Sequence, residues 1–184
     1  MAQSRTNKAD NARRGAFLDR DGVLNMDTGF PNDPAELVLV PGADAAVRRL
    51  NDVGFAVLVV SNQSGVARGM FDLDAVDRFN RALADKIAEA GGRIDGFYVC
   101  PYHPDSVVDQ FRHPDHPDRK PNPGMILRGL SEHGLDPAQS FMIGDKESDV
   151  EAAYRAGITG YRFEGGSLDH TVRSVLAEPP FGVR

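Results

Sequence analysis

The sequence predicts an α/β fold, a three-layer Rossmann-like sandwich built around a mostly parallel central sheet. Short apolar runs alternate along the chain with amphipathic stretches, which is the pattern of strands and helices in βα units. Two of these runs, 55–61 and 140–143, are almost continuously apolar, as expected for strands that are covered on both faces. A length of 184 residues is sufficient for one well-buried core.

Five strands and four helices are expected. The strands are predicted at 15–18, 55–61, 96–100, 140–143 and 159–163. The helices are predicted over 43–53 and 72–90, after Pro123, and over 147–156. Asp72 or Asp74 is the expected N-cap of the second helix, and Gly91 is expected to end it.

The composition is that of a soluble globular protein, with 41% hydrophobic and 26% charged residues. A net charge of −6 argues against general nucleic-acid binding, and no apolar run approaches the roughly 20 residues that span a bilayer. The single cysteine, Cys100, excludes an intramolecular disulfide and suits a reducing cytoplasm. We therefore expect a cytoplasmic monomer with no nucleic-acid or membrane partner, in which residues 14–184 form one domain behind a mobile leader, residues 1–13.

Two segments interrupt the βα pattern. Residues 101–123 are rich in proline and histidine, which precludes regular structure over most of that length. The segment 25–42 is shorter, contains glycine and proline, and could form a flap beside the first strand. Long loops inside compact domains are usually functional or disordered.

Two aspartates, Asp19 and Asp21, stand two residues apart just after the first predicted strand. The carboxyl edge of an open α/β sheet is where such folds bind ligands. One carboxylate can attack as a nucleophile while its neighbour transfers a proton, and together they can hold a divalent cation. The spacing alone is weak, because a chain with 27 acidic residues produces it often by chance.

Other strand ends carry polar residues that suit the same reaction. Ser61 follows the second strand and can offer its hydroxyl and its backbone amide to a phosphate oxygen, although a turn or a helix cap explains it equally well. Lys120 follows the long loop and is a point charge suited to a phosphoryl group. Asp145 and Asp149 follow the fourth strand, one helical turn apart, where they could also serve the helix dipole.

Taken together, these residues describe a phosphoryl-transfer site. Attack by an aspartate on a dianionic phosphate requires that the charge repulsion be cancelled, which Mg²⁺ and a lysine can do. Magnesium prefers oxygen ligands and retains several waters, so two carboxylates and a backbone carbonyl are enough.

The four motifs Asp19-x-Asp21-Gly22, Ser61, Lys120 and Gly144-Asp145-x-x-x-Asp149 resemble those of the haloacid dehalogenase superfamily, and the second aspartate favours its phosphatases. The resemblance covers about residues 15 to 165. The stretches "DRDGVLN", "SNQSGVARGMF", "RKPNPGM" and "IGDKESD" further resemble the D-glycero-D-manno-heptose 1,7-bisphosphate 7-phosphatases, compact members without a large cap domain.

The resemblance implies a role for each matching residue. Asp19 would be the nucleophile that forms an aspartyl-phosphate, and Asp21 the general acid and base. Asp19, the backbone carbonyl of Asp21, and Asp145 would bind Mg²⁺, while Ser61 and Lys120 would hold the transferring phosphate. Asp149 would orient Lys120 or a metal-bound water. The rest of the sugar phosphate would be bound by Asn62, Gln63, Arg68 and Arg119.

The long loop departs from the family pattern. Many members hold a structural zinc there through Cys-x-His and a later Cys-x-Cys, whereas here Cys100 is followed by Tyr102 and His103, and the second pair is absent. His113, His116 and Asp118 could in principle replace the missing ligands, because zinc accepts nitrogen and oxygen donors. We expect no structural zinc.

Three functions follow from these observations. The first is a Mg²⁺-dependent phosphatase that removes the 7-phosphate of a heptose 1,7-bisphosphate. The second is a histidinol-phosphate phosphatase, from a related group that shares the aspartates and the "RKP" motif, or another small-metabolite phosphomonoesterase. The third is a non-catalytic phosphate-binding regulatory protein, which the presence of all four motif residues disfavours.

Overall fold

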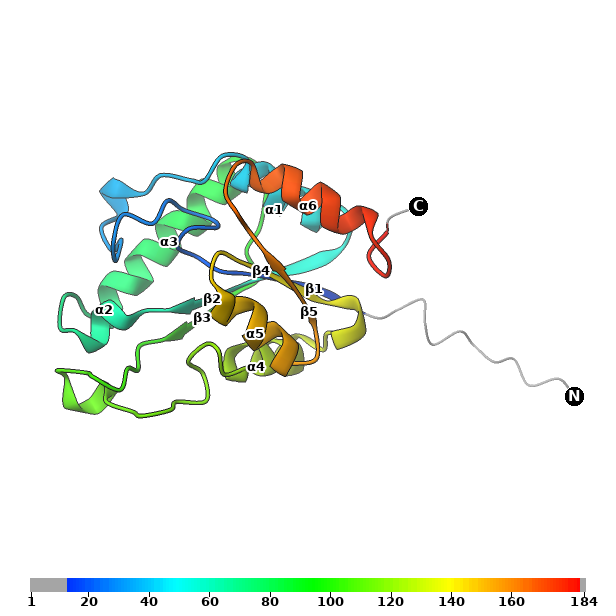
Figure 1. Ribbon diagram of the computed structural model, residues 1–184. Coiled ribbons are helices and arrows are strands. Elements are labelled where there is room, and N and C mark those ends of the chain that lie inside the picture. Colours follow the sequence, from blue (N-terminus) through cyan, green and yellow to red (C-terminus); the bar gives the residue numbers. More distant parts are fainter. Residues whose placement is uncertain (1–12, 183–184) are drawn as a thin grey trace, which may run out of the picture.

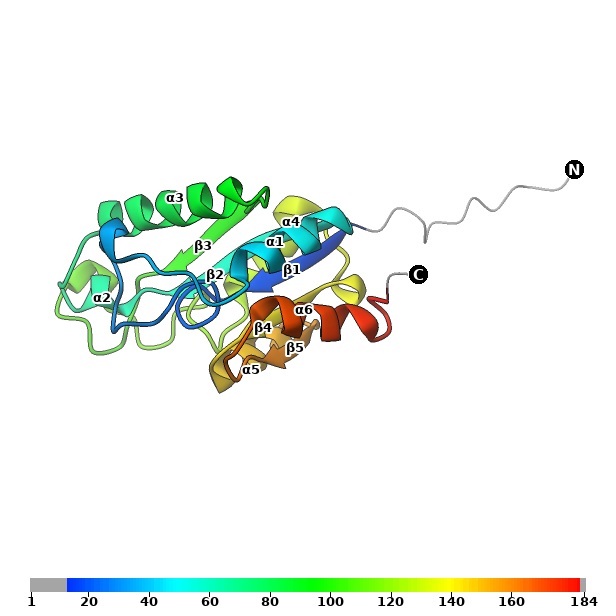
Figure 2. The ribbon, with the colours of Figure 1, turned by 90° about the horizontal axis from the view of Figure 1, so that it is seen from above.

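The computed structural model describes residues 13–182, which form a five-stranded parallel sheet between two layers of helices (Figures 1 and 2). The strand order is β3-β2-β1-β4-β5. The strands are β1 (Arg14–Leu18), β2 (Phe55–Asn62), β3 (Gly96–Cys100), β4 (Phe141–Gly144) and β5 (Thr159–Arg162). The expected α/β class and all five predicted strands are confirmed, with ends that differ by at most one residue. The expected leader, 1–13, lies almost entirely outside the described residues.

The helices cover both faces of the sheet. α1 (Ala43–Asp52), α3 (Leu73–Glu89) and α6 (Leu168–Ala177) lie on one face, and α4 (Gly124–His133) and α5 (Glu147–Arg155) lie on the other (Figure 1). The four predicted helices are confirmed. Asp72 is the N-cap of α3, because its side chain accepts a hydrogen bond from the amide of Ala75 at 2.8 Å.

Two helices were not predicted. The one-turn helix α2 (Ser64–Ala67) is too short to produce a periodic pattern. The helix α6 carries such a pattern, with buried residues at four spaced positions, although two glycines separate it from the last strand. Its buried residues are Leu168, Val172, Val175 and Leu176.

The core is divided by the sheet, because successive side chains of a strand point to opposite faces. Ala16 and Leu18 of β1 pack with the layer formed by α1, α3 and α6. Phe17 packs with the layer formed by α4 and α5. All three side chains are fully buried. This burial fixes the register of β1, and with it the point at which the chain leaves the sheet toward Asp19.

The segment 26–38 leaves the sheet edge and returns to it. Its two ends are held together by a hydrogen bond from the amide of Met26 to the carbonyl of Val38, at 2.9 Å. A second bond, from the amide of Val40 to the carbonyl of Leu24, closes the base at 3.0 Å. The excursion contains a single 3₁₀ turn, η1 (Pro34–Glu36), so it forms the expected flap beside β1.

The long loop 101–123 contains only one turn of 3₁₀ helix, η2 (Asp109–Phe111), as its composition predicts. Another such turn, η3 (Pro137–Gln139), precedes β4. The loop is fastened to the end of α2, where the hydroxyl of Ser106 and the amide of Val107 both donate to the carbonyl of Ala67 at 2.9 Å. Within residues 13–182, no helix has the length and apolar character needed to cross a membrane.

Replacement of the α3 cap tests how this helix is held. Asp72→Ala should destabilise the protein by about 1 kcal/mol, because the amide of Ala75 loses its acceptor. The free energy of unfolding, measured by urea denaturation, gives the value. The matched control is Asp77→Ala, an exposed mid-helix aspartate that should change stability by less than about 0.5 kcal/mol. Equal effects of the two variants would contradict the assigned cap.

Candidate active site

Lys120 is the centre of the polar cluster at the carboxyl edge of the sheet. Its side chain is only 2% exposed, and its Nζ lies 2.9 Å from Asp19 Oδ1 and 2.7 Å from Asp149 Oδ1. The same nitrogen donates a hydrogen bond to the carbonyl of Val60 at 2.8 Å. Burial acts to lower the pKa of Lys120, but the two carboxylates outweigh it and the pKa is raised. The ammonium therefore remains charged inside the protein.

The backbone of Lys120 is held by the side chain of Asn62. The amide of Lys120 donates to Asn62 Oδ1, and Asn62 Nδ2 donates to the carbonyl of Lys120, both at 3.0 Å. Asn62 ends β2, so this two-point contact ties the end of the long loop to the sheet. The side-chain amide that was expected to bind substrate is thus engaged with the backbone of Lys120 in this structure.

Asp19 is buried directly beneath the lysine, with 5% of its surface exposed. Burial raises the pKa of Asp19 to about 7, an effect that Lys120 partly offsets and Asp149 increases. Its Oδ1 also accepts a hydrogen bond from the amide of Arg20 at 2.8 Å. The carboxyl group is therefore held in one place, and its ionised form requires further positive charge.

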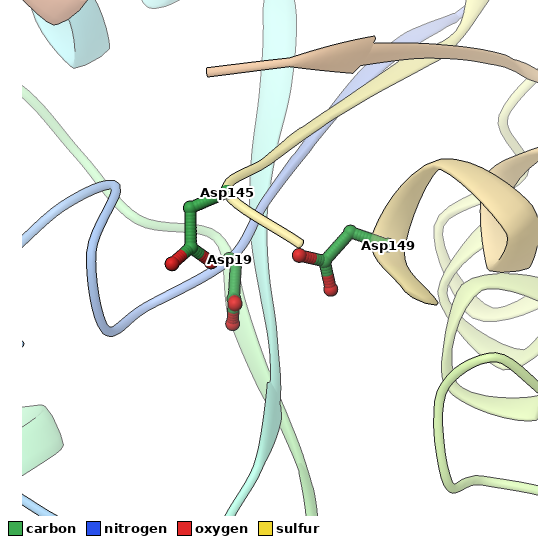
Figure 3. Close-up of side chains that lie close together, drawn as sticks. All are labelled: Asp19, Asp145 and Asp149. Atoms are coloured by element: carbon green, nitrogen blue, oxygen red, sulfur yellow. The ribbon is translucent and has the colours of Figure 1, made fainter. Parts of the chain in front are cut away.

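Asp145 and Asp149 bring two more carboxylates to Asp19. Figure 3 shows the three side chains converging from the end of β1, the end of β4 and α5. One oxygen from each lies within 4.8 Å of the others. Oδ1 of Asp145 is buried and has no hydrogen-bond partner among the described residues, and burial raises the pKa of this carboxyl as well. Two buried carboxylates and a half-buried one, beside the buried Lys120 and the exposed Lys146, fit a divalent cation with oxygen ligands.

Gly22 leaves room for Asp145. Its φ of +88° is a conformation that favours glycine, and a Cβ at this position would lie 2.6 Å from Asp145 Oδ2. The backbone of the Asp-x-Asp-Gly turn therefore lies close to the carboxylate of Asp145, the residue that follows β4. The glycine of the motif serves both the turn and the close approach.

Asp21 lines the same hollow as Lys120 and is surrounded by hydrogen-bond donors. Nε and Nη2 of Arg20 donate to its two oxygens at 2.9 and 3.0 Å, and Asn25 Nδ2 donates at 3.0 Å. Gln63 Nε2 donates to Asp21 Oδ2 at 2.9 Å and to Ser61 Oγ at 2.8 Å. This second carboxylate is therefore held in a fixed orientation, and Gln63 links it to the buried serine.

A small hollow opens above these groups. It has a volume of about 40 Å³, roughly three times the ~10–15 Å³ that one water molecule requires. Its walls are formed by Asp19, Asp21, Ser61, Asn62, Lys120, Lys146, Ser148 and Asp149. Its walls offer hydroxyl and ammonium donors together with carboxylate oxygens, which suits a small tetrahedral oxyanion and a cation.

The two arginines expected to bind substrate lie farther out. Arg119 is partly buried, and its Nη1 donates to Ser64 Oγ and to the carbonyl of Tyr102, both at 3.0 Å. Arg68 follows α2 and is exposed. Arg119 lies in the long loop, and neither arginine side chain lines the hollow.

Sequence reasoning missed three contributors to the site. Arg20 and Asn25 orient Asp21, and Lys146, although exposed, lines the hollow. Arg20 and Lys146 each stand beside a motif aspartate, which was the only available signal. Their roles depend on side-chain direction, which adjacency in the sequence does not give.

The candidate zinc ligands of the long loop make other contacts. The ring of Tyr102 stacks on His116 at 3.8 Å, and His113 packs edge-on against both. In each of three His-Pro-Asp triplets, the histidine Nδ1 accepts a hydrogen bond from the amide of the aspartate. Among the described residues, the aspartate cluster is the one group of three or more metal-binding side chains with converging ligand atoms. The expectation of no structural zinc stays a prediction.

Known proteins provide an independent comparison. A family model described as HAD-hydrolase-like matches residues 118–181. A D-glycero-beta-D-manno-heptose-1,7-bisphosphate 7-phosphatase from Rhodopseudomonas palustris is 46% identical over 167 residues, covering 90% of this chain and 92% of the relative. A protein of the same name from Mesorhizobium japonicum is 40% identical, covering 91% of this chain and 74% of the relative.

A solved structure agrees with these relatives. The D,D-heptose 1,7-bisphosphate phosphatase of B. bronchiseptica, determined with magnesium and phosphate, superposes with a TM-score of 0.73 and 30% identity. The match covers 90% of this chain and 89% of the other. The resemblance expected from the sequence motifs is thereby confirmed. The chain belongs to the heptose-1,7-bisphosphate 7-phosphatase family of HAD-like hydrolases, and it is a phosphatase, an enzyme that hydrolyses phosphoric monoesters.

Proposed function

We propose that this enzyme is a Mg²⁺-dependent phosphatase that removes the 7-phosphate of D-glycero-β-D-manno-heptose 1,7-bisphosphate through an aspartyl-phosphate intermediate. The observation that carries the proposal is the placement of Lys120 between Asp19 and Asp149, beside a third carboxylate with an unpartnered buried oxygen. That arrangement combines a nucleophile, a fixed cation and a set of metal ligands. The substrate comes from the names of relatives that align over most of the chain.

The metal would be held by Asp19, Asp145 and the backbone carbonyl of Asp21, with Asp149 close by. When bound, Mg²⁺ neutralises charge on the carboxylates and on the phosphoryl oxygens. The two raised carboxyl pKa values support this assignment, because a nearby divalent cation favours the ionised forms that burial disfavours.

Asp19 would attack the phosphorus atom, forming the bond from its carboxylate oxygen to phosphorus as the bond to the sugar oxygen breaks. Lys120 would hold one phosphoryl oxygen, and the hydroxyl of Ser61 would donate to another. The departing sugar oxygen needs a proton, and Asp21, which lines the same hollow as Asp19, would donate it. Water would then attack the phosphorus of the aspartyl-phosphate, lose its proton to Asp21, and release Asp19 and inorganic phosphate.

Substrate choice would depend on groups outside the hollow. About 40 Å³ accommodates a phosphoryl group but not a sugar, so the rest of the substrate would lie against the bordering loops. Arg68 and Arg119 are cations on those loops, and a guanidinium can contact a phosphate through two parallel hydrogen bonds. This favours a sugar with a second, distant phosphate over histidinol phosphate, the alternative substrate.

Substitution of the nucleophile tests the mechanism. Asp19→Asn should abolish turnover, because it removes the attacking oxygen anion while keeping the side-chain volume. Asp21→Asn should reduce kcat by about 10²–10⁴-fold, the usual contribution of a general acid or base. Steady-state rates of both variants measure the loss of turnover, and circular dichroism spectra check that both variants fold. Turnover of Asp19→Asn near the unmodified rate would rule out the aspartyl-phosphate route.

Magnesium affinity should depend on pH. The pKa of Asp19 without metal is raised to about 7, so below that pH Mg²⁺ must displace a proton from the carboxyl group. Apparent affinity should therefore weaken as pH falls below about 7, by up to about tenfold per pH unit. Calorimetric titration of the metal-free protein from pH 5.5 to 8.5 measures this, with the same titration of Asp19→Asn as control. A flat profile for the unmodified enzyme would contradict Asp19 as a ligand.

The substrate is tested by comparing values of kcat/KM. We expect kcat/KM for the heptose 1,7-bisphosphate to be at least about tenfold higher than kcat/KM for histidinol phosphate, because binding energy from the distant phosphate can be used at the reacting centre. Arg119→Ala should narrow this gap by reducing the value for the bisphosphate more than the value for the monophosphate. The matched control is Arg93→Ala, an exposed arginine paired with Asp95 just before β3, at the opposite edge of the sheet. Equal values for the two substrates would reverse the assignment.

A further inference from the structure

Phe30 occupies an unusual backbone position in the flap. Among residues 13–182 it is the one non-glycine residue with a positive φ, at 59°, and Gly29 before it has a φ of +86°. A bulky side chain is disfavoured in this left-handed conformation. The ring is 39% exposed, so it is not drawn there by full burial. Strain of this kind persists only where surrounding contacts impose it, and it concentrates at functional sites.

The flap backbone around Phe30 is held on both sides. Asn32 Nδ2 donates to the carbonyl of Phe30 at 3.0 Å. Arg20 Nη2 donates to the carbonyl of Pro31 at 3.0 Å, while the same guanidinium holds Asp21 through two hydrogen bonds. Arg20 is itself 1% exposed. The position of the Phe30 ring is therefore linked to the acid/base carboxylate through one buried arginine.

The ring faces Arg68. The guanidinium carbon lies 5.7 Å from the centre of the Phe30 ring, within the range of a cation–π contact. The side chain of Arg68 makes no hydrogen bond or ion pair with any other residue of the described range 13–182. The ring is thus the contact that restricts the guanidinium, and it leaves the five N–H donors of that group unused.

The flap also contacts a second cation of the site. Asp27 Oδ2 lies 3.7 Å from Nζ of Lys146, and Lys146 lines the phosphoryl hollow. The segment 26–31 therefore approaches the hollow on one side and Arg68 on the other. If the phosphate of a substrate is held near Lys120, the flap and Arg68 would lie beside the rest of that substrate.

We propose that Phe30 is a specificity-determining residue that positions Arg68 to bind the second phosphate of a bisphosphorylated substrate. This inference rests on the proposed function, because it requires a substrate with two phosphates. The ring holds the guanidinium in place before substrate arrives, which reduces the conformational entropy lost when the distant phosphate binds. Under this proposal, changes to the carbon skeleton of the sugar leave kcat/KM unchanged, whereas removal of the second phosphate lowers it.

The test compares the heptose 1,7-bisphosphate with the same sugar phosphorylated only at position 7. Phe30→Gly removes the ring and relieves the backbone, because glycine adopts a positive φ readily, so this variant should fold. Phe30→Leu retains an apolar side chain without a π face, and Phe30→Tyr retains the π face. For Phe30→Gly and Phe30→Leu, the ratio of kcat/KM for bisphosphate over monophosphate should fall by about fivefold, mainly through KM for the bisphosphate. Phe30→Tyr should keep the ratio of the unmodified enzyme.

Three further variants make the result specific. Arg68→Ala should lower the same ratio, and Arg68→Ala combined with Phe30→Gly should lower it no further, because both act through one contact. Met26→Ala replaces another exposed apolar residue of the flap and should leave the ratio unchanged. If the unmodified enzyme shows no preference for the bisphosphate, the proposed function fails. If that preference exists and Phe30→Gly and Phe30→Leu retain it, or if the double variant is fully additive, the role of Phe30 is refuted.

Discussion

The buried ammonium of Lys120 is the interaction on which the rest of the site depends. Charge in a protein interior is costly unless it is paired and hydrogen-bonded, and Lys120 has two carboxylates and the carbonyl of Val60 within 3 Å. The arrangement links four parts of the chain, since Asp19 follows β1, Val60 lies in β2, Lys120 ends the long loop and Asp149 lies in α5. Removing any one partner would leave an uncompensated charge at the meeting point of these elements.

The same cluster contains more carboxylates than ammonium groups. Asp19, Asp145 and Asp149 place three carboxylates beside two lysines, the buried Lys120 and the exposed Lys146, and burial raises the pKa of both Asp19 and Asp145. A fold optimised only for stability would not retain a buried carboxylate oxygen without a partner, such as Oδ1 of Asp145. The imbalance is what a divalent cation would correct, so the residual cost in the metal-free protein is a consequence of the chemistry that the site is built to perform.

Residues at the strand ends could be predicted from the sequence because of the fold. Parallel strands with continuous apolar runs have their carboxyl ends at one edge, so Asp19, Ser61 and Asp145 had to lie near one another once the strands were assigned. Lys120 required the family resemblance, because it ends a loop whose path no periodicity describes. The partners of Asp21 could not be predicted, since they depend on side-chain direction. The backbone conformation of Phe30 could not be predicted either, because bulky residues rarely adopt the left-handed region.

Chemistry and selectivity are carried by different kinds of structure in this protein. Asp19 and Lys120, to which we assign the chemistry, are buried, and both the side chain and the backbone of Lys120 are fixed by hydrogen bonds or ion pairs. The cations that would recognise the rest of the substrate are held by fewer contacts, Arg119 by two hydrogen bonds and Arg68 by a single ring. A hollow of about 40 Å³ has room for little beyond a phosphoryl group, so it offers few contacts that could distinguish one monoester from another. Substrate choice can therefore change through the flap and the long loop while the cluster around Lys120 stays intact.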